Sequence, residues 1–312
     1  MIWLIGSTGM LGSEIAELLK KNSIPFVGTG SEIDITDFDQ LNAFAQSHER
    51  KPSGIQSAER ITWIVNCAAY TAVDKAEEEE EKARLVNTTG PLNIARVARA
   101  IGAKLIHIST DYVFDGSASA PYTEDMAVCP VGVYARTKAD GEKAVQKEMT
   151  QYYIFRTSWL YGFYGKNFVY TMTSLMNKGN ELKVVCDQRG TPTCASTLAS
   201  VIVRVIEGAE NATKLFGHHA ALPYGVYNVS DEGETTWFDF AKEIYRLGKK
   251  YKRISCDCAL SPCTTAEYPT KAKRPAYSVL SKAKIQKEAG IKLPQWKDAL
   301  EHFIKDSRFE VR

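Results

Sequence analysis

The chain has 312 residues, of which 44% are hydrophobic and 24% charged, a composition typical of a globular protein. Its 39 basic and 37 acidic residues leave a net charge of +2, so we expect neither a nucleic acid nor a membrane surface as a partner. No apolar run is long enough to span a bilayer, and the first residues lack the features of a signal peptide. These properties predict a cytoplasmic protein.

The chain begins with a pattern that predicts a nucleotide-binding site. An apolar run at residues 1–6 leads directly into the sequence Gly6-Ser-Thr-Gly9-Met-Leu-Gly12. Residues 14–21 then have helical apolar spacing and end in lysines, which suit the C-terminal end of a helix. In a strand, glycine turn and helix of this kind, the glycines let the backbone approach a pyrophosphate. The spacing is G-x-x-G-x-x-G rather than G-x-G-x-x-G, and a plain strand-to-helix turn is the alternative.

The next strand bears on the choice of cofactor. Residues 25–29 form this predicted strand, and no acid follows it before Glu32. NAD-preferring sites have an acid at this point to bind the ribose 2′-OH, so its absence favours NADPH, with NADH as the alternative. A helix is predicted to begin within Asp34-Ile-Thr-Asp37, with Asp34 or Thr36 as its cap.

Strands and helices then alternate. Further strands are predicted at residues 63–67, 103–108 and 152–156, and helices at residues 87–100 and beyond residue 138. This alternation predicts an α/β fold with a Rossmann-type, doubly wound parallel sheet. Gly6, Ala68 and Thr110 each follow a strand, so we expect them at the carboxyl edge of the sheet, where ligands bind.

The second half of the chain lacks this regular alternation. We expect residues 1–160 to form an NAD(P)-binding Rossmann domain, with segments from about 190–215 returning to it. Residues 161–312 are expected to form mostly a smaller α/β lobe that binds the substrate.

Two clusters of polar residues are interpreted as having no catalytic role. The acidic run Glu77–Glu81 predicts the first turns of a solvated helix. Cys256, Cys258 and Cys263 have the spacing C-x-C-x4-C and no nearby histidine, so we predict no zinc site.

The candidate catalytic residues lie in the sequences 106–115 and Tyr134-Ala-Arg-Thr-Lys138. Residues four apart share one face of a helix, and an ammonium near a phenol favours the phenolate, which would lower its pKa. We therefore expect Tyr134 to donate or accept a proton, tuned by Lys138, and Thr110 to hydrogen-bond the same substrate oxygen. The Y-x-x-x-K motif alone is weak, because ordinary surface helices also contain it.

Together these motifs resemble the extended short-chain dehydrogenase/reductase family and, within it, the dTDP-4-dehydrorhamnose reductases. The similarity covers nearly the whole chain and is more specific than the glycines alone. The matching stretches are residues 6–12, 66–77, 109–116, 134–138, 156–162, 187–193, 274–275 and 293–296.

The resemblance implies NADPH-dependent reduction of the 4-keto group of dTDP-6-deoxy-L-lyxo-4-hexulose to dTDP-L-rhamnose. It implies that Tyr134 protonates the substrate oxygen, that Lys138 holds the nicotinamide ribose and that Thr110 orients the carbonyl. From the motifs and the resemblance, the expected cofactor contacts are Gly6, Gly9, Met10, Leu11, Gly12, Asp34, Ile35, Ala68, Ala69, Tyr70, Thr71, Tyr134 and Lys138. The expected contacts to the nucleotide sugar are Thr110, Asp111, Tyr112 and Trp159.

Some members of this family bind magnesium through acids at a dimer interface. Glu14 matches one of these acids, but Ser196 and Lys297 replace the other two, so we predict no metal and leave a homodimer open.

Two other functions remain as alternatives. One is a different nucleotide-sugar reductase or epimerase. The other is a non-catalytic, NADP-binding regulatory subunit like that of methionine adenosyltransferase, because a site can outlive its chemistry.

Overall fold

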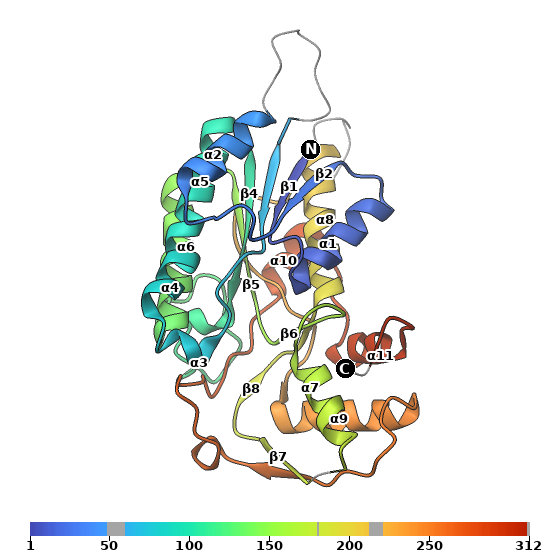
Figure 1. The fold of residues 1–312 in the computed structure, drawn as a ribbon. Helices are drawn as coiled ribbons and strands as arrows, with labels where there is room; N and C mark the ends of the chain where they lie inside the picture. The colour runs from blue at the N-terminus through green and yellow to red at the C-terminus, as the bar shows by residue number, and fades with distance from the viewer. Residues whose placement is uncertain (49–59, 180, 212–220, 311–312) are drawn as a thin grey trace.

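The computed structural model describes residues 1–48, 60–179, 181–211 and 221–310. It has two parts, a layered sheet-and-helix domain and a smaller lobe below it in the view of Figure 1. In the described ranges, no helix combines the length and apolar character that a membrane crossing requires.

Six parallel strands form the central sheet, in the order β10-β5-β4-β3-β1-β2. They are β1 (Ile2–Ile5), β2 (Phe26–Thr29), β3 (Trp63–Asn66), β4 (Lys104–Thr110), β5 (Tyr152–Thr157) and β10 (Gly225–Asn228). Strands β1 and β3 are buried throughout and apolar except for Asn66 at the end of β3, as expected for parallel strands covered on both faces. The strand order reverses at β1, between β2 and β3, which is where sheets of this kind bind ligands. The prediction of a doubly wound parallel sheet is confirmed.

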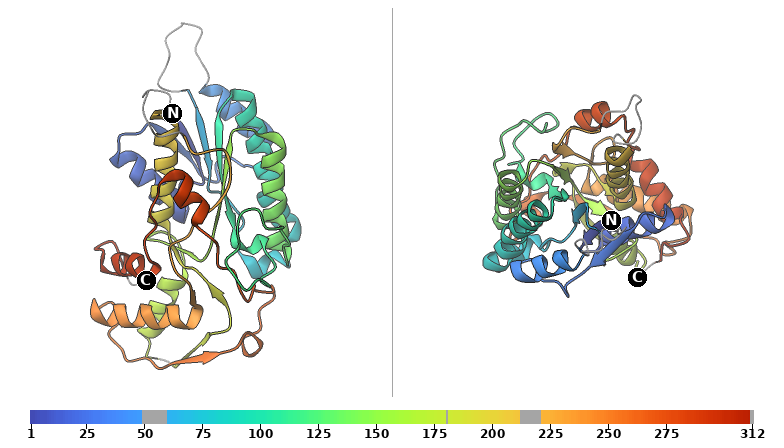
Figure 2. Two further views of the ribbon diagram at one scale, coloured as in Figure 1. Left: turned by 180° about the vertical axis from the view of Figure 1, so that it is seen from behind. Right: turned by 90° about the horizontal axis from the view of Figure 1, so that it is seen from above.

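Helices cover both faces of the sheet (Figure 2). One face packs against α1 (Met10–Lys21), α8 (Ala195–Asn211) and α10 (Ala283–Ala289). The other face packs against α2 (Phe38–Ser47), α5 (Gly90–Ile101) and α6 (Val133–Glu148). The short helices α3 (Val73–Ala76) and α4 (Glu80–Arg84) and the π-helical turn η1 (Leu85–Thr89) precede α5.

The segments that return to the sheet extend beyond the expected residues 190–215. Strand β10 forms the edge of the sheet beside β5, and α10 packs on the same face as α8. Part of the expected segment, residues 212–220, lies outside the described residues. The sheet domain is therefore built from at least three separate stretches of chain.

The predicted cap of α2 is wrong. Asp37, rather than Asp34 or Thr36, precedes the helix and accepts hydrogen bonds from Asp39 N and Gln40 N. The Asp34 side chain instead accepts from the backbone and hydroxyl of Thr36. The chain thus makes one more turn before the helix begins.

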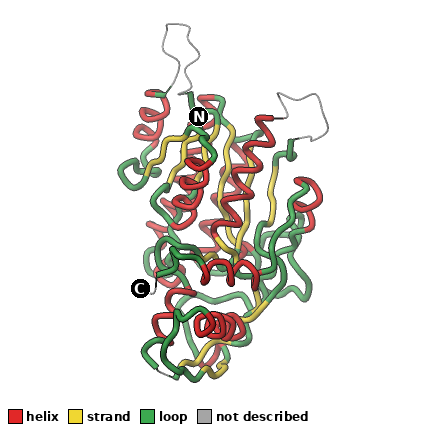
Figure 3. Tube along the Cα trace, turned by 90° about the vertical axis from the view of Figure 1, so that its right-hand side faces the viewer, coloured by secondary structure: helices red, strands yellow, loops and turns green. Residues whose placement is uncertain are grey.

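The smaller lobe has its own core of aromatic side chains, including Tyr161, Phe240 and Phe303. It lies beyond the ends of the sheet strands, as the side view of Figure 3 shows. Its elements are β6 (Leu160–Tyr161), α7 (Phe168–Met176), β7 (Leu182–Val185), β8 (Arg189–Gly190), β9 (Thr193–Cys194), β11 (Thr235–Thr236), α9 (Trp237–Lys250), β12 (Leu260–Cys263) and α11 (Trp296–Lys305). The strands pair as β7 with β12, β8 with β11 and β6 with β9.

A buried ion pair fixes α6 to the sheet. Arg156 on β5 donates from Nε to Glu142 Oε1 at 3.0 Å and from Nη2 to Oε2 at 2.7 Å. Both side chains are 3% exposed. Such a two-pronged pair restricts both the distance and the rotation of the helix relative to the strand.

We predict that Glu142→Leu lowers the free energy of unfolding by about 3–5 kcal/mol, because it leaves a buried guanidinium without its counter-charge. Urea unfolding followed by circular dichroism measures the change. Asp140→Ala is the matched control, since Asp140 pairs with Lys143 on the exposed side of the same helix. Equal stability of the two variants would contradict a structural role for the buried pair.

Candidate active site

The start of α6 places Tyr134 and Lys138 beside the end of β4. Lys138 is 2% exposed, and its Nζ donates to the backbone carbonyl of Ile108 at 2.6 Å. The Tyr134 ring meets the Tyr112 ring edge to face, with 5.6 Å between the ring centroids. The two residues of the motif therefore both reach the carboxyl end of β4.

Thr110, the last residue of β4, lies close to the same point. Its hydroxyl donates to Asp111 Oδ1 at 3.0 Å and accepts from Tyr112 N at 3.2 Å, which caps the short 3-10 helix η2 (Asp111–Val113). Burial raises the pKa of Tyr134, and hydrogen bonding by Thr110 opposes this rise. The structure thus brings together Thr110, Tyr134 and Lys138, as the motif predicted.

The expectation that Tyr134 has a lowered pKa beside Lys138 is wrong. Burial raises the pKa of Tyr134 above its ordinary value, and the nearby Asp111 and Tyr112 raise it further. Burial also lowers the pKa of Lys138 to about 8, and its ammonium faces the Ile108 carbonyl. Tyr134 therefore keeps its proton through the neutral range. Asp111 is buried too, and its pKa is raised to about 6, chiefly by burial.

A cradle of bare backbone lies where the sequence predicted the nucleotide loop. Gly6 has φ +76°, and a Cβ on it would lie 2.8 Å from Ala68 N. A Cβ on Gly12 would lie 2.1 Å from Gly6 O. Helix α1 begins after Gly9, which offers no side chain to cap it, so the first N–H groups of the helix are left for another acceptor. These features fit a pyrophosphate, and the loops after β1 and β3 meet here at the switch point of the sheet.

The other expected cofactor contacts surround this cradle. The side chains of Leu11 and Ile35 belong to the apolar core, so these residues face outward only through their backbones. Tyr70 is fixed at both ends, because its N–H donates to Asn87 Oδ1 at 2.9 Å and its hydroxyl donates to Glu79 at 2.8 Å. Met10, Asp34, Ala69 and Thr71 all retain some exposure on the loops that follow β1, β2 and β3.

Asn87 is a residue that the sequence did not single out. It lies in the π-helical turn, and its Nδ2 donates to Tyr70 O at 3.0 Å and to Thr137 Oγ1 at 3.3 Å. It therefore links the loop after β3 to the helix that carries Tyr134. Gly141 permits the close packing, since a Cβ there would lie 2.2 Å from Asn87 O.

The sequence predicted that the acidic run would be solvated, and this prediction holds only in part. Glu80 and Glu81 do lie exposed in the first turn of α4. Glu77, however, accepts from Val133 N at 2.8 Å, and Glu79 accepts from Tyr70. Glu80 also pairs with Arg136 on α6 at 3.6 Å, so several members of the run contact elements of the candidate site.

Just before this run, Asp74 joins the sheet domain to a distant segment. It accepts from Ala272 N at 3.1 Å and from Arg274 Nη2 at 2.6 Å. Pro275 then crosses over Gly116, where a Cβ would lie 2.6 Å from the proline ring. We call residues 270–281 the strap, because they run from the smaller lobe back across the sheet domain.

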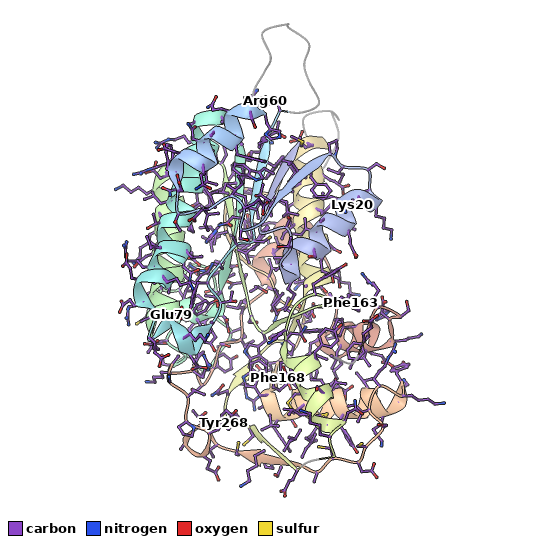
Figure 4. All side chains as sticks on the ribbon, in the orientation of Figure 1. Lys20, Arg60, Glu79, Phe163, Phe168 and Tyr268 are labelled. Atoms are coloured by element: carbon purple, nitrogen blue, oxygen red, sulfur yellow. The ribbon has the colours of Figure 1, made fainter. Side chains whose placement is uncertain are left out.

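A cavity of about 530 Å³ lies between the smaller lobe and the sheet domain. Tyr112, which contacts Tyr134, lines it. Figure 4 labels two more of its aromatic residues, Phe168 on α7 and Tyr268 before the strap. The full lining is Val73, Asp74, Tyr112, Phe168, Thr171, Met172, Leu175, Leu182, Lys183, Val184, Val185, Gln188, Trp237, Tyr268, Thr270 and Arg274.

Trp159 supports the wall of this cavity. Its backbone has φ +46°, which is strained for a residue with a side chain, and its ring stacks on Trp237 with centroids 3.6 Å apart. Gly190 leaves room for the ring, since a Cβ there would lie 2.6 Å from it. Among the described residues it is Trp237 that lines the cavity, with Trp159 behind it.

The three residues compared with a metal site lie near the starts of three different helices. Glu14 is buried on α1, and burial raises its pKa. Ser196 lies in the first turn of α8 and Lys297 in that of α11. Within the ranges that the structure describes, no three His, Cys, Asp or Glu side chains come together as metal ligands would.

The depressed pKa of Lys138 predicts a specific dependence of stability on pH. The folded protein releases this proton near pH 8, whereas the unfolded chain holds it to about 10.5. Between these values the unfolded state binds more protons, so stability rises with pH. We expect the free energy of unfolding of the wild type, relative to Lys138→Met, to rise by at most about 3 kcal/mol across this window. Urea unfolding at several pH values tests this, and a constant difference would show that Lys138 titrates normally.

Comparison with known proteins places the chain in a family. The family model described as RmlD substrate binding domain matches residues 1–309. The chain is 36% identical over 308 residues to the dTDP-4-dehydrorhamnose reductase of Escherichia coli (strain K12), covering 98% of this chain and 97% of that protein. It is 37% identical over 315 residues to a probable dTDP-4,6-dihydroxy-2-methyloxan-3-one 4-ketoreductase of Streptomyces antibioticus, covering 98% and 95%.

A solved structure agrees with these relatives. It is the dTDP-4-dehydrorhamnose reductase of Bacillus anthracis strain Ames in complex with NADP, with a TM-score of 0.83 and 34% identity over 97% of each chain. Proteins named as reductases are thus similar to this chain over nearly its whole length. This chain is the one that carries the sheet, the glycine cradle and the Tyr134–Lys138 pair described above. The chain belongs to the RmlD family, the oxidoreductase family of the dTDP-4-dehydrorhamnose reductases.

Proposed function

We propose that this protein uses NADPH to reduce the 4-keto group of dTDP-6-deoxy-L-lyxo-4-hexulose, giving dTDP-L-rhamnose. The observation that carries the proposal is the meeting of Tyr134, Thr110 and Lys138 at the carboxyl end of β4, beside a cavity that Tyr112 lines. A proton donor next to a cavity for a large substrate is what reduction of a carbonyl requires.

The proposed cofactor site is the cradle formed by Gly6, Gly12 and the start of α1. When bound there, a nicotinamide cofactor supplies the hydride for the carbonyl carbon. Lys138 is the residue proposed to hold its ribose. The structure also brings the Glu32 carboxylate back to the end of β2, where it accepts from Gly30 N at 2.6 Å. An acid near this point suits an unphosphorylated ribose, so NADH must be compared with NADPH.

Tyr134 acts as the proton donor in this proposal. Its raised pKa keeps the phenol protonated at neutral pH, so a proton is ready for the oxygen that becomes negative as the carbonyl is reduced. When it turns its proton from Asp111 Oδ1 to the same oxygen, the Thr110 hydroxyl orients the carbonyl. The tyrosinate that remains regains a proton from solvent.

The cavity provides the features that a nucleotide sugar needs. Lys183 and Arg274 supply positive charge for a diphosphate, and Trp237 and Tyr268 offer aromatic surfaces for a sugar or base. The proposed substrate contacts Asp111 and Tyr112 lie on the side of the candidate acid, and Trp159 contributes through Trp237. The lobe around the cavity is therefore the proposed nucleotide-sugar-binding lobe.

Other functions remain as alternatives. A related keto sugar is supported by the relative from Streptomyces antibioticus, which is named as a ketoreductase of a different dTDP sugar. A nucleotide-sugar epimerase would use the same hydride chemistry. A regulatory subunit would bind NADP without turnover and would copurify with a partner enzyme. The cytoplasmic location and a homodimer stay predictions.

The proposal predicts that wild-type protein oxidises NADPH in the presence of dTDP-6-deoxy-L-lyxo-4-hexulose. Tyr134→Phe is expected to reduce kcat by about 10²–10⁴-fold, because it removes the proton donor. Reduced-cofactor absorbance measures turnover with NADPH and with NADH, and product analysis identifies the sugar. Tight NADPH binding without turnover of this substrate would exclude the reductase and direct the search to the alternatives.

The cradle makes a second prediction. Gly12→Ala should weaken NADPH binding about tenfold or more, since its methyl group would overlap the Gly6 carbonyl and displace the loop. Quenching of tryptophan fluorescence on NADPH titration measures the affinity. Gly208→Ala is the matched control, because a Cβ at this position of α8 meets no atom within 4 Å. Unchanged affinity in Gly12→Ala would place the cofactor elsewhere.

A further inference from the structure

Helix α6, which carries Tyr134 and Lys138, begins without a cap of its own. The residue before it is Gly132, which has φ +87° and no side chain to bond the free N–H groups of the first turn. The N–H of Val133 instead donates to Glu77 Oε1 at 2.8 Å. The cap thus comes from a residue 56 positions earlier in the chain.

The local packing is built around this carboxylate. A Cβ on Gly132 would lie 2.7 Å from Glu77 Oε1, so the carboxylate occupies the space that a local capping side chain would need. Glu77 is partly buried between α3 and α4. A carboxylate at this end of a helix is favoured both by the hydrogen bond and by the helix dipole.

The rest of α6 is held by other contacts. One turn further on, Lys138 donates to Ile108 O, and Thr137 O accepts from the Thr88 hydroxyl at 2.9 Å. The buried ion pair of Glu142 secures the next turn. Tyr134, the second residue of the helix, lies before all of these contacts and directly beside the N–H that Glu77 binds.

We propose that Glu77 is a positioning residue that holds Tyr134 in place for proton transfer. This inference rests on the proposed role of Tyr134 as the acid. Glu77 acts through the first turn of α6, which fixes the direction of the Tyr134 side chain toward Thr110. Its own segment also carries the cofactor-loop residue Tyr70 and the strap contact Asp74, so one stretch of chain places the acid relative to both proposed ligands.

The test compares Glu77→Ala, Glu77→Gln and Glu81→Ala with the wild type. Glu77→Ala removes the acceptor, so kcat should fall by roughly 10- to 100-fold, the cost of a small displacement of a reacting group. The KM for the keto sugar and the Kd for NADPH should stay unchanged, because Lys138 and the cavity keep their contacts. Glu77→Gln keeps an acceptor oxygen and should keep most of the activity. Among the residues that the structure describes, Glu81 pairs only with Arg84 on the exposed side of α4, so Glu81→Ala should behave as wild type.

Hydrogen exchange provides a readout that does not depend on turnover. In Glu77→Ala, the amides of residues 133–136 should exchange faster, while those from residue 138 onward should not change. A wild type that fails to reduce the keto sugar would defeat the proposed function, yet this exchange pattern would still test the cap. If Glu77→Ala does not fold, Glu77→Asp is used, since its shorter side chain should lose the hydrogen bond while keeping the charge.

Two results would overturn the inference. One is an unchanged kcat together with unchanged exchange at residues 133–136 in a folded variant that lacks the acceptor. The other is a proportional loss of kcat, NADPH affinity and substrate affinity, because that pattern indicates general damage to the fold and not a displaced acid.

Discussion

The buried ion pair of Glu142 with Arg156 is the contact on which the arrangement of the candidate site depends. It ties α6 to β5, the neighbour of β4, at the point where these strands end. With that distance fixed, Lys138 reaches the carbonyl of Ile108, and Tyr134 stands over the end of the same strand. The pair also raises the cost of any rotation of α6, since a two-pronged bond has little freedom to turn.

Much of the sheet could be predicted from the sequence for a physical reason. Strands covered on both faces are mostly apolar, and Gly6 directly follows β1 while Thr110 ends β4. The carboxyl ends of parallel strands share one edge, so residues such as Gly6, Ala68 and Thr110 were expected to lie together. The cradle and the proximity of Thr110 to Tyr134 agree with that reasoning.

What the sequence did not reveal depends on partners distant in the chain. Nothing in the acidic run indicates that Glu77 meets the start of α6. The sequence around Asp74 likewise does not indicate that this residue meets Arg274, 200 positions away. The pKa of Tyr134 was misjudged because the spacing to Lys138 says nothing of burial, which is the largest cause of its rise. The stacking of Trp159 on Trp237 likewise depends on a fold in which the two tryptophans meet, which the sequence does not reveal.

The order of the strands has a consequence for synthesis of the protein. The edge strand β10 and the covering helix α8 come from beyond residue 190, and α10 comes later still. Until those residues have emerged from the ribosome, one face of the sheet is covered by α1 alone, and β5 lacks its neighbour β10. Domains usually fold as the chain emerges, but this one must wait for α8, β10 and α10, which alternate along the chain with elements of the smaller lobe. The nascent chain therefore keeps apolar surface of the sheet exposed until these elements have been made, and such surface favours aggregation and the binding of chaperones.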